Sequence, residues 1–513
     1  MQYDAEKVTL GICKIGFEGC AERAVDLDFN LPDYCPDIQK ILKCQIYPKV
    51  TMRNIAGETL SVDGFYLVKL IYLDSEKMSI RCCEHTSPFS VQFNLKENME
   101  NGIVYTKIKV EYINCRALNQ RRLEIHGAFS VCAKVKIKEE KSIVSGISGE
   151  SIEQKKISTI VNDLIAMPQV QFSIEENIEL DPDILPIELI LRSDLSLNVN
   201  DIKTLNNKVI INAKAKLDLF YVNDLESGNT EFVSFDIPIS QIVDVIGAEE
   251  DSICDVILEE INHDLELKLD EENGDQTLKI DMRFIFSGLI YNEKEIDYLE
   301  DAYSVSFETQ KEIANNELLK IKEKVNLDFE DKNEIELNVL KINKVLDVWN
   351  EVIDLKGEKD DKDKIILKGK YNLCILILNE NDEPVYAEKL IDFKYSYDPG
   401  GDIDLAFFEI EALITDINYK IKNDNILEVD VDLNFSGVIY IDDNFESIVD
   451  LKIDEELPIE KDNDAVLKIY YAEKDETVWD IARKYNIPVD KIKLENEIEE
   501  DTLKTSMMLL IPM

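Results

Sequence analysis

The chain repeats parts of its own sequence at an interval of 149 residues. The peptide FSGLIY at residues 286–291 returns as FSGVIY at residues 435–440. The residues before each copy also match, LKID with LEVD, and a third version, LEIH, occupies residues 123–126. A fixed interval of this kind is the sequence signature of duplicated structural units. We therefore predict three related units of about 150 residues each.

Apolar runs predict that these units are built from strands. Five apolar positions of the first unit recur 149 residues later: Ile38, Ile41, Leu42, Ile46 and Val50 return as Ile187, Ile190, Leu191, Leu195 and Val199. Residues 60–72, 209–221 and 365–378 are rich in β-branched residues with partial alternation, which is typical of strands. Turn-forming residues such as Asn273-Gly274 and residues 379–382 interrupt the runs. The predicted fold is multidomain and mainly β.

The predicted layout is three β-rich repeats followed by a small C-terminal domain. At 513 residues the chain is too long to fold around one hydrophobic core, since single cores stop growing at roughly 250–300 residues. The predicted ranges are 1–147, 157–312 and 325–460 for the repeats and 466–513 for the C-terminal domain. Inside the third repeat, Lys341 to Val352 is predicted to form a helix, because its apolar residues are spaced by three and four: Ile342, Val345, Leu346 and Trp349.

The charge of the chain argues against several classes of partner. Its 57 Lys and Arg residues face 105 Asp and Glu residues, and the resulting net charge of −48 repels phosphate backbones and anionic lipid surfaces. We expect no nucleic-acid partner and no insertion into membranes. The acidic surface serves either general solvation or recognition of a basic partner, and charge alone does not separate the two.

Export signals and membrane helices are also missing from the sequence pattern. Residues 1–30 mix charged and apolar side chains, so no basic segment precedes an apolar one as in a secretory signal. The densest apolar run, residues 373–378, is shorter than the roughly 18–20 residues of a membrane helix. We therefore expect a soluble protein of the cytoplasm.

Cysteines are concentrated near the N-terminus, where eight of the ten lie within the first 132 residues of the chain. None forms a Cys-x-x-Cys pair, and in a cytoplasmic protein the ordinary expectation is a set of reduced, mostly buried thiols. Cys82, Cys83 and His85 are close enough in sequence to suggest zinc. On a strand, however, Cys82 and Cys83 would face opposite sides of the sheet, so we predict no metal site.

Catalytic patterns are absent from the sequence. It contains no phosphate-binding Gly-rich loop, no nucleophile elbow and no metalloprotease motif, and its three histidines, His85, His126 and His263, are widely separated. Asp and Glu are so abundant that paired carboxylates carry no signal for glycosidase chemistry. We predict a protein that is not an enzyme, with no catalytic residue and no cofactor.

Residues 467–512 carry a βααβ pattern. The predicted elements are a strand at 467–471, a helix at 478–485, a helix after Pro488 and a strand at 507–511. Thr477 is a good N-cap for the first helix, with Asp480 three residues later in position to return the bond. Together with Tyr471, Trp479 and the closing Leu-Ile-Pro, this pattern resembles a LysM domain.

The LysM resemblance implies a shallow binding groove between two loops, which in that family usually holds N-acetylglucosamine polymers. Here the loops are residues 475–479 and 496–505. The candidate residues for binding a partner or a glycan are Asp475, Glu476, Thr477, Val478, Trp479, Asn496, Ile498 and Thr505.

The two loops depart from the family pattern in ways that favour a protein ligand. The usual Pro-Gly-Asp-Thr turn is replaced by residues 474–477, KDET, and the usual Lys-Pro-Gly-Gln by residues 504–507, KTSM. Both glycines that permit close approach to a sugar are therefore missing. The second loop gains four acidic residues, which suit a basic protein surface better than an uncharged glycan: Glu497, Glu499, Glu500 and Asp501. Glycan binding stays open as the alternative.

Two interpretations of Trp479 remain open. It is either a partly buried helix residue that supports the domain or an aromatic anchor for a ligand. Ile498 is predicted to contribute to the same surface, inside the acidic rim.

The peptide LPDYCPDI at residues 31–38 has two Pro-Asp steps, which favour an extended segment bounded by turns. With the three repeats and the LysM-like end, it resembles the SPOCS domain of clostridial spore-coat morphogenetic proteins. The second repeat keeps only Pro182-Asp183-Ile184 and Pro186, and the third repeat lacks the motif.

The resemblance implies a non-enzymatic scaffold or adaptor of spore coat assembly. It implies synthesis in the mother-cell cytoplasm, a position around the forespore, and binding to the coat-basement ATPase, sporulation stage IV protein A, and to other coat proteins. The alternative is a wall-associated protein that binds peptidoglycan or N-acetylglucosamine polymers.

Overall fold

The computed structural model describes residues 4–149, 151–269, 276–360, 364–400, 405–459 and 466–512. Within these ranges the chain forms strands β1 to β23 and two short helices, α1 and α2, so the prediction of a mainly β protein is confirmed. Both described helices have eight residues, and neither is long enough to cross a membrane.

The first unit of the fold contains two antiparallel sheets of three strands. One sheet has the order β2-β3-β4 and the other β1-β6-β5, and side chains from both enclose one apolar core. The strands are β1 (Asp4–Asn30), β2 (Ile38–Ala56), β3 (Thr59–Asp74), β4 (Ile80–Asn94), β5 (Ile103–Ala117) and β6 (Arg122–Ser148).

The second unit uses the same strand order with one interruption. Its sheets are β11-β10-β9 and β12-β13, and both β7 and β8 pair with the far edge of β13. The break between β7 and β8 contains Pro168, which has no N–H to donate to a ladder. The strands are β7 (Ile152–Ala166), β8 (Gln169–Glu179), β9 (Leu189–Leu205), β10 (Lys208–Asp224), β11 (Asn229–Asp244), β12 (Ile253–Leu269) and β13 (Gln276–Ser304).

In the third unit, the long strand pair seen as β1 and β6 in the first unit is split into two separate pairs, β15 with β20 and β14 with β21. Its sheets are β16-β17-β18 and β15-β20-β19, with β14 and β21 as a separate pair. The strands are β14 (Phe307–Asn316), β15 (Leu319–Glu336), β16 (Ile342–Lys359), β17 (Ile365–Asn379), β18 (Pro384–Tyr397), β19 (Leu405–Asn423), β20 (Ile426–Asp442) and β21 (Phe445–Pro458).

The repeated peptides lie on central strands. FSGLIY is part of β13, FSGVIY is part of β20, and Leu123 lies in β6. Each of these strands is the middle strand of its sheet. The predicted turn at residues 379–382 joins β17 to β18, whereas Asn273-Gly274 lies outside the described residues.

The middle strands of the other sheets, β3, β10 and β17, are buried on both faces. In β3, Leu70 and Tyr72 point into the core of the first unit, while Ile71 and Leu73 join a second cluster shared with the other units. A strand buried on both faces needs apolar residues at every position, which explains the near-continuous apolar runs in the sequence.

The shared cluster contains residues of all three units. Leu42 and Leu191 meet there, and so do Ile71 and Phe220; the members of each pair are 149 residues apart in sequence. The buried residues that the third unit contributes to this cluster come from β16 and β17. The three units therefore have cores of their own and are also joined to each other by apolar packing.

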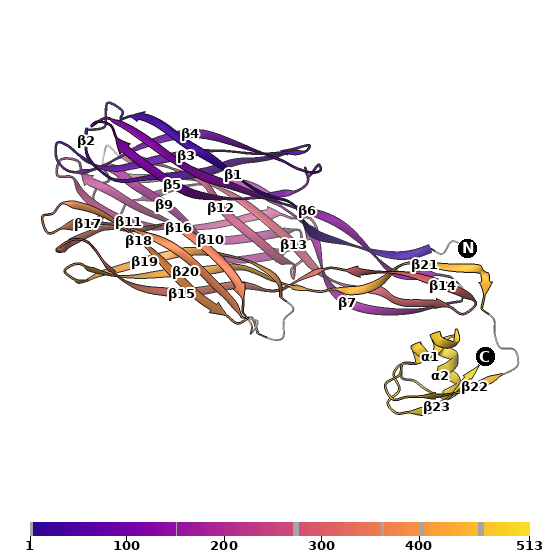
Figure 1. The fold of residues 1–513 in the computed structure, drawn as a ribbon. Coiled ribbons are helices and arrows are strands. Elements are labelled where there is room, and N and C mark those ends of the chain that lie inside the picture. Colours follow the sequence, from indigo (N-terminus) through magenta and orange to yellow (C-terminus); the bar gives the residue numbers. More distant parts are fainter. Residues whose placement is uncertain are drawn as a thin grey trace.

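Three strand pairs continue beyond the sheets and form what we call the stalk (Figure 1). The first half of β1 pairs with the end of β6, β7 pairs with the end of β13, and β14 pairs with β21. Buried residues from the three pairs, such as Val144, Leu299 and Ile448, pack in common clusters. The residues at the predicted repeat boundaries, 147, 157 and 312, all lie in stalk strands, while 325 lies in β15; the domain ranges stay predictions.

The predicted helix at residues 341–352 is wrong, because this segment lies in strand β16. The spacing by three comes from irregular pairing: the register with β17 shifts after Ile342, after Val345 and after Asn350. Each shift inserts an extra residue, so that residues three apart face the same side of the strand. Ile342, Val345 and Val348 therefore pack in the core of the third unit. Leu346 and Trp349 pack in the shared cluster.

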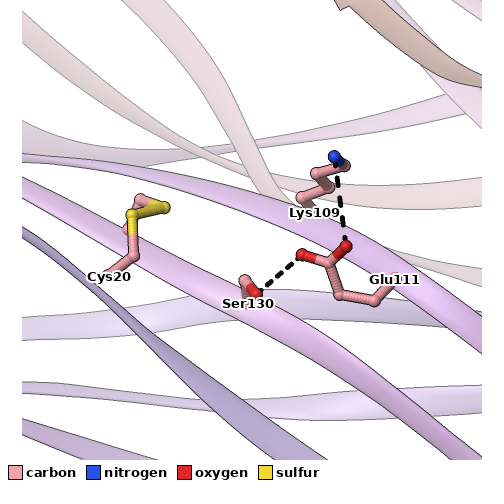
Figure 2. The surroundings of a disulfide bond; sticks show 5 residues. Cys20, Lys109, Glu111 and Ser130 are labelled. Carbon is pink, nitrogen blue, oxygen red and sulfur yellow. Dashed lines mark hydrogen bonds and ion pairs between the residues drawn. A yellow bond between two sulfur atoms is a disulfide. The ribbon is translucent and has the colours of Figure 1, made fainter.

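The expectation that the cysteines are reduced is corrected at one pair. Cys20 and Cys132 form a disulfide. They are direct neighbours across β1 and β6, a pairing that periodicity within one strand does not reveal. Figure 2 shows the disulfide beside Ser130, whose hydroxyl donates to Glu111. The other eight cysteines are free thiols, five of them buried.

Candidate functional site

The C-terminal module consists of β22 (Leu467–Ala472), α1 (Val478–Tyr485), α2 (Val489–Asn496) and β23 (Met507–Pro512). β22 and β23 form an antiparallel pair. Thr477 caps α1: its side chain accepts a hydrogen bond from the Asp480 N–H at 3.1 Å and donates one to the Asp480 carboxylate at 2.6 Å. Ile481, Ile492 and Leu509 lie in the apolar core of the module.

The two candidate loops are hydrogen-bonded to each other along their backbones. The Asp475 N–H donates to the Leu503 carbonyl at 2.8 Å, and the Leu503 N–H donates to the Glu476 carbonyl at 2.9 Å. The Val478 N–H donates to the Asp501 carbonyl at 2.8 Å. Asp475, which stands where the family has glycine, adopts the left-handed conformation with φ of 70°. The turn therefore keeps a glycine-like backbone but carries a side chain.

Four of the predicted site residues support the module itself. Val478 is fully buried, and Thr477 is the helix cap. Asn496 holds β23 in place, since its side chain accepts from the Leu510 N–H and donates to the Leu510 carbonyl. The Glu476 carboxylate accepts a hydrogen bond from the Tyr470 hydroxyl at 2.9 Å.

The other four candidates differ in exposure and in what they contact. Asp475 and Thr505 are exposed, and Ile498 is half-buried against the module core. Trp479 is also half-buried, but it points at the stalk.

Trp479 contacts the end of β13. Its indole Nε1–H donates to Asp301 Oδ2 at 3.0 Å, and its ring meets the Tyr303 ring edge-on with 5.1 Å between centroids. Arg483, one helical turn later, donates from Nη1 to the same Asp301 oxygen at 2.8 Å. Tyr303 and Val305 pack with the apolar residues of the module. Trp479 thus joins the module to the second unit, a role that neither predicted interpretation included.

Asp301 is the centre of this contact. It is buried, and it accepts a further hydrogen bond from Lys311 of β14 at 2.8 Å. Burial alone raises the pKa of Asp301, but the bonds from Lys311 and Trp479 outweigh it and hold the pKa below its usual value. The carboxylate is therefore charged and fully engaged at neutral pH.

Two further hydrogen bonds complete the contact. The Tyr303 hydroxyl donates to the Ile487 carbonyl at 2.7 Å, and the Val489 N–H donates to Glu153 Oε2 at 3.3 Å. These bonds reach the connection between the two helices and the first residue of α2 from β13 and β7. In Figure 1 the module lies beside the end of the stalk.

The outer side of the β22–β23 pair exposes an apolar surface, which we call the hairpin face. Ile469 is 59% exposed and Tyr471 is 76% exposed, with Met508, the direct partner of Tyr471, at 52%. Leu467 lies beside them at 44%. The sequence of residues 467–471 indicates this face, because every second residue is apolar and points to the same side of the strand. In a pair of only two strands, one side stays uncovered, so these residues are exposed.

The predicted acidic rim of the second loop is present but partly neutralised. Glu497, Glu499, Glu500 and Asp501 are exposed. Within the module, Lys504 pairs with Glu500 and Lys493 with Asp501.

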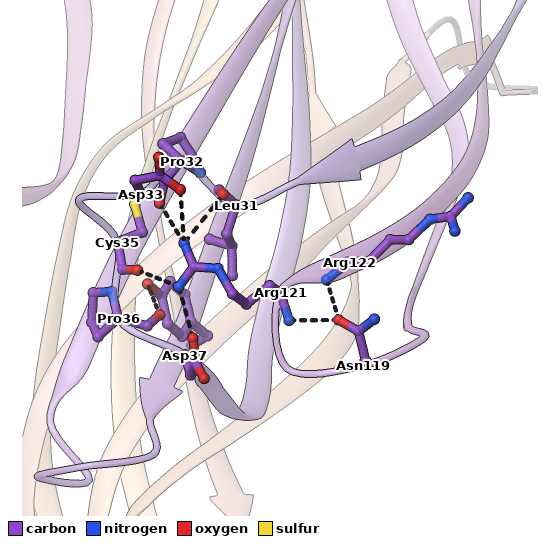
Figure 3. Close-up of polar contacts among 10 residues, drawn as sticks. Leu31, Pro32, Asp33, Cys35, Pro36, Asp37, Asn119, Arg121 and Arg122 are labelled. Carbon is purple, nitrogen blue, oxygen red and sulfur yellow. Dashed lines mark hydrogen bonds and ion pairs between the residues drawn. The ribbon is translucent and has the colours of Figure 1, made fainter.

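The LPDYCPDI segment is fixed by Arg121 (Figure 3). This guanidinium donates to the carbonyls of Pro32 at 2.9 Å and Cys35 at 3.1 Å, and to the Asp37 carboxylate at 2.7 Å. Tyr34, between these anchors, is 85% exposed. The motif is a rigid loop that closes one end of the first unit.

Metal-binding residue types come together at one described place, where Glu351, Cys374 and Glu388 lie close to each other. The Lys43 ammonium is 3.1 Å from Glu351 and 2.9 Å from Glu388, so it already supplies the positive charge. Cys82 lies toward the shared cluster and Cys83 toward the core of the first unit, on opposite faces of β4.

Charged pairs line the seams between the units. A cavity of about 1460 Å³ lies where the three units meet, bordered by Arg192 and Glu409 among others. Lys216 of the second unit binds Asp416 of the third at 2.6 Å, and Lys49 of the first binds Glu260 of the second at 2.9 Å. These pairs fix how the units face each other.

Comparison with known families identifies three segments of the chain. Residues 37–118 and 186–268 match the SipL, SPOCS domain, and residues 470–512 match the LysM domain. The two SPOCS matches span β2 to β5 and β9 to β12, which are corresponding parts of the first and second units. No curated protein and no solved structure matches the chain.

The matched domains set the functional class. SPOCS and LysM are non-catalytic binding domains, and the SPOCS domain suggests a coat-associated role in sporulation. The resemblances drawn from the LPDYCPDI motif and from the βααβ pattern are confirmed. The chain carries SPOCS domains of the SipL type in its first two units and a LysM domain at its C-terminus.

Proposed function

We propose that this chain is a non-enzymatic scaffold of spore coat assembly, with the LysM module as its protein-binding part. The observation that carries the proposal is the combination of SPOCS domains with a LysM domain whose hairpin face is apolar and exposed. A protein partner gains affinity from covering such a face, because apolar and aromatic side chains are then removed from water.

We further propose that the three units are copies of one module arranged about a common axis. Corresponding strands occupy corresponding sheet positions, and residues 149 apart meet in the shared cluster. The third unit fits this arrangement through β16 to β19, although the SPOCS matches cover the first two units. A rigid three-part body holds the LysM module at one end, which suits a spacer between a basement layer and outer proteins.

The proposed partner is the coat-basement ATPase, sporulation stage IV protein A, together with other coat proteins. The proposed location is the mother-cell cytoplasm, around the outer surface of the forespore. Both proposals rest on the family resemblance, and the net charge of −48 favours a partner surface with basic residues.

Binding of peptidoglycan or N-acetylglucosamine polymers is the second candidate, because the LysM match favours it. Two observations weigh against it. The loops are bonded to each other along their backbones, and Asp475 carries a side chain where a glycine would let a sugar approach.

The test is co-purification of the full chain with the ATPase from sporulating cells. Ile469→Arg places a charge on the hairpin face and is expected to abolish co-purification. Ile246→Arg is the matched control, since Ile246 is 87% exposed on a turn of the second unit, away from the module. Equal recovery of the ATPase with both variants would contradict the proposal.

A further inference from the structure

Helix α1 of the LysM module has a second binding surface, and this surface is already occupied within the chain. Trp479 and Arg483 both donate to Asp301 Oδ2, and Tyr303 stands edge-on to the Trp479 ring. The hairpin face makes none of these described contacts and stays exposed.

We propose that the end of β13 is a docking site for helix α1, and that an external protein which uses Trp479 must displace it. The chemistry that α1 recognises is visible in the contact: a carboxylate between an indole N–H and a guanidinium, beside an aromatic ring. The external partner class is therefore a protein that presents an acidic side chain next to an aromatic one. This inference rests on the proposed function of the module.

The docking site is built to hold a charge. Asp301 is 7% exposed, and Lys311, which belongs to the stalk and not to the module, donates to its other oxygen at 2.8 Å. Lys311 belongs to β14, so the site combines two stalk pairs. Because a buried carboxylate needs partners, release of the module must be compensated by water or by another donor at Asp301.

The contact between the stalk and the module involves more than helix α1. The Tyr303 hydroxyl donates to the Ile487 carbonyl in the connection between the two helices, and Glu153 accepts from the Val489 N–H at the start of α2. Three residues of the stalk thus meet four residues of the module. This fixes one orientation of the module and covers one face of Trp479.

The test uses the fluorescence of the full chain. The chain has two tryptophans, so in a Trp349→Phe background Trp479 is the single emitter. Asp301→Asn removes the charge that Trp479 and Arg483 share. The ratio of docked to released module should fall about tenfold or more, because hydrogen bonds to a charged group are among the strongest. We expect a red shift of the Trp479 emission and stronger quenching by acrylamide.

Asp297→Asn in the same background is the matched control. Asp297 lies four residues earlier on β13 and pairs with Ser158 rather than with the module. Its emission and quenching should equal those of the parent. Thermal unfolding followed by circular dichroism checks that all variants fold. Arg483→Gln is the second probe, and it should repeat the effect of Asp301→Asn from the module side.

The outcomes are separable from those of the proposed function. Unchanged emission and quenching in folded Asp301→Asn and Arg483→Gln chains would overturn the docking site, whatever the chain binds. If docking is confirmed, titration with the ATPase should show tighter binding for Asp301→Asn than for Asp297→Asn. Equal affinity of the two variants would overturn the displacement.

Discussion

The ion pair between Arg192 and Asp347 joins the second unit to the third and gives a quantitative test of how the units are held together. Arg192 donates from Nε and Nη2 to the two Asp347 oxygens at 2.8 and 2.9 Å. The side chains are 3% and 1% exposed. The guanidinium also lies 5.0 Å from the centre of the Trp349 ring. The pair is therefore shielded from solvent and sits beside a natural fluorescent probe.

Asp347→Leu should lower the free energy of unfolding by roughly 3 kcal/mol. Removing one partner of a buried pair typically costs about 3–5 kcal/mol, because it leaves an unpaired buried charge. We place the effect at the lower end because Asp194, which also pairs with Arg192, stays in place. The double variant Arg192→Met with Asp347→Leu should recover most of the loss, since apolar residues of similar volume can replace a buried pair.

Denaturation followed by Trp349 emission, in a Trp479→Phe background where Trp349 is the single emitter, measures this effect at the seam, and circular dichroism follows the whole chain. Asp416→Leu is the control, because its partnership with Lys216 is half-exposed and should contribute less than about 1 kcal/mol. The reasoning fails if Asp347→Leu and Asp416→Leu shift the midpoint equally, or if the double variant is as unstable as the single one.

Three further outcomes are expected. Alkylation of the denatured chain without reductant should modify eight of its ten cysteines, and Cys20→Ser should cost about 2–5 kcal/mol of stability; ten modified cysteines would contradict the disulfide. Burial raises the pKa of Glu260, but bonds from His263 and Lys49 outweigh it and lower the pKa to about 2. A lowered folded pKa means stability that is present above the ordinary pKa and lost as pH falls toward 2, so the unfolding midpoint of Glu260→Gln should depend less on pH below about 4.5 than that of the parent. Arg121→Ala should speed hydrogen exchange in residues 31–38 without changing exchange in the stalk, and unchanged exchange would show that the loop is held by other contacts.

The strands that carry the fold were predictable because their pattern is local. The runs that become β3, β10 and β17 are rich in β-branched residues and alternate in part, which indicates strands. Each also contains a continuous apolar stretch, at residues 70–73, 219–222 and 373–378, where the strand is buried on both faces. The LysM segment was equally clear, since the cap at Thr477 and the two short helices follow from neighbouring residues.

Features that depend on two distant segments were not predictable. The helix expected around Trp349 failed because bulges in the pairing with β17 imitate helical spacing. The Cys20–Cys132 disulfide depends on the register of β1 with β6. The contact of Trp479 with Asp301 joins residues 178 apart in sequence, and no spacing rule relates them.

The eight candidate residues for binding stay a prediction, but the structure shows where each of them lies. They divide into supports of the module, exposed loop positions, one half-buried residue and one stalk contact, as Asn496, Thr505, Ile498 and Trp479 illustrate. The hairpin face was missed, although the alternation that indicates it is present in residues 467–471.

The central claim is that the LysM module binds protein rather than glycan. The most direct measurement titrates the full chain, with Ile469→Arg and Ile246→Arg beside it, against the coat ATPase and against chitin oligomers at two salt concentrations. The account predicts salt-sensitive binding to the ATPase that Ile469→Arg abolishes and Ile246→Arg preserves, with no binding to the oligomers. Tight, salt-insensitive binding to the oligomers together with no binding to the ATPase would contradict it.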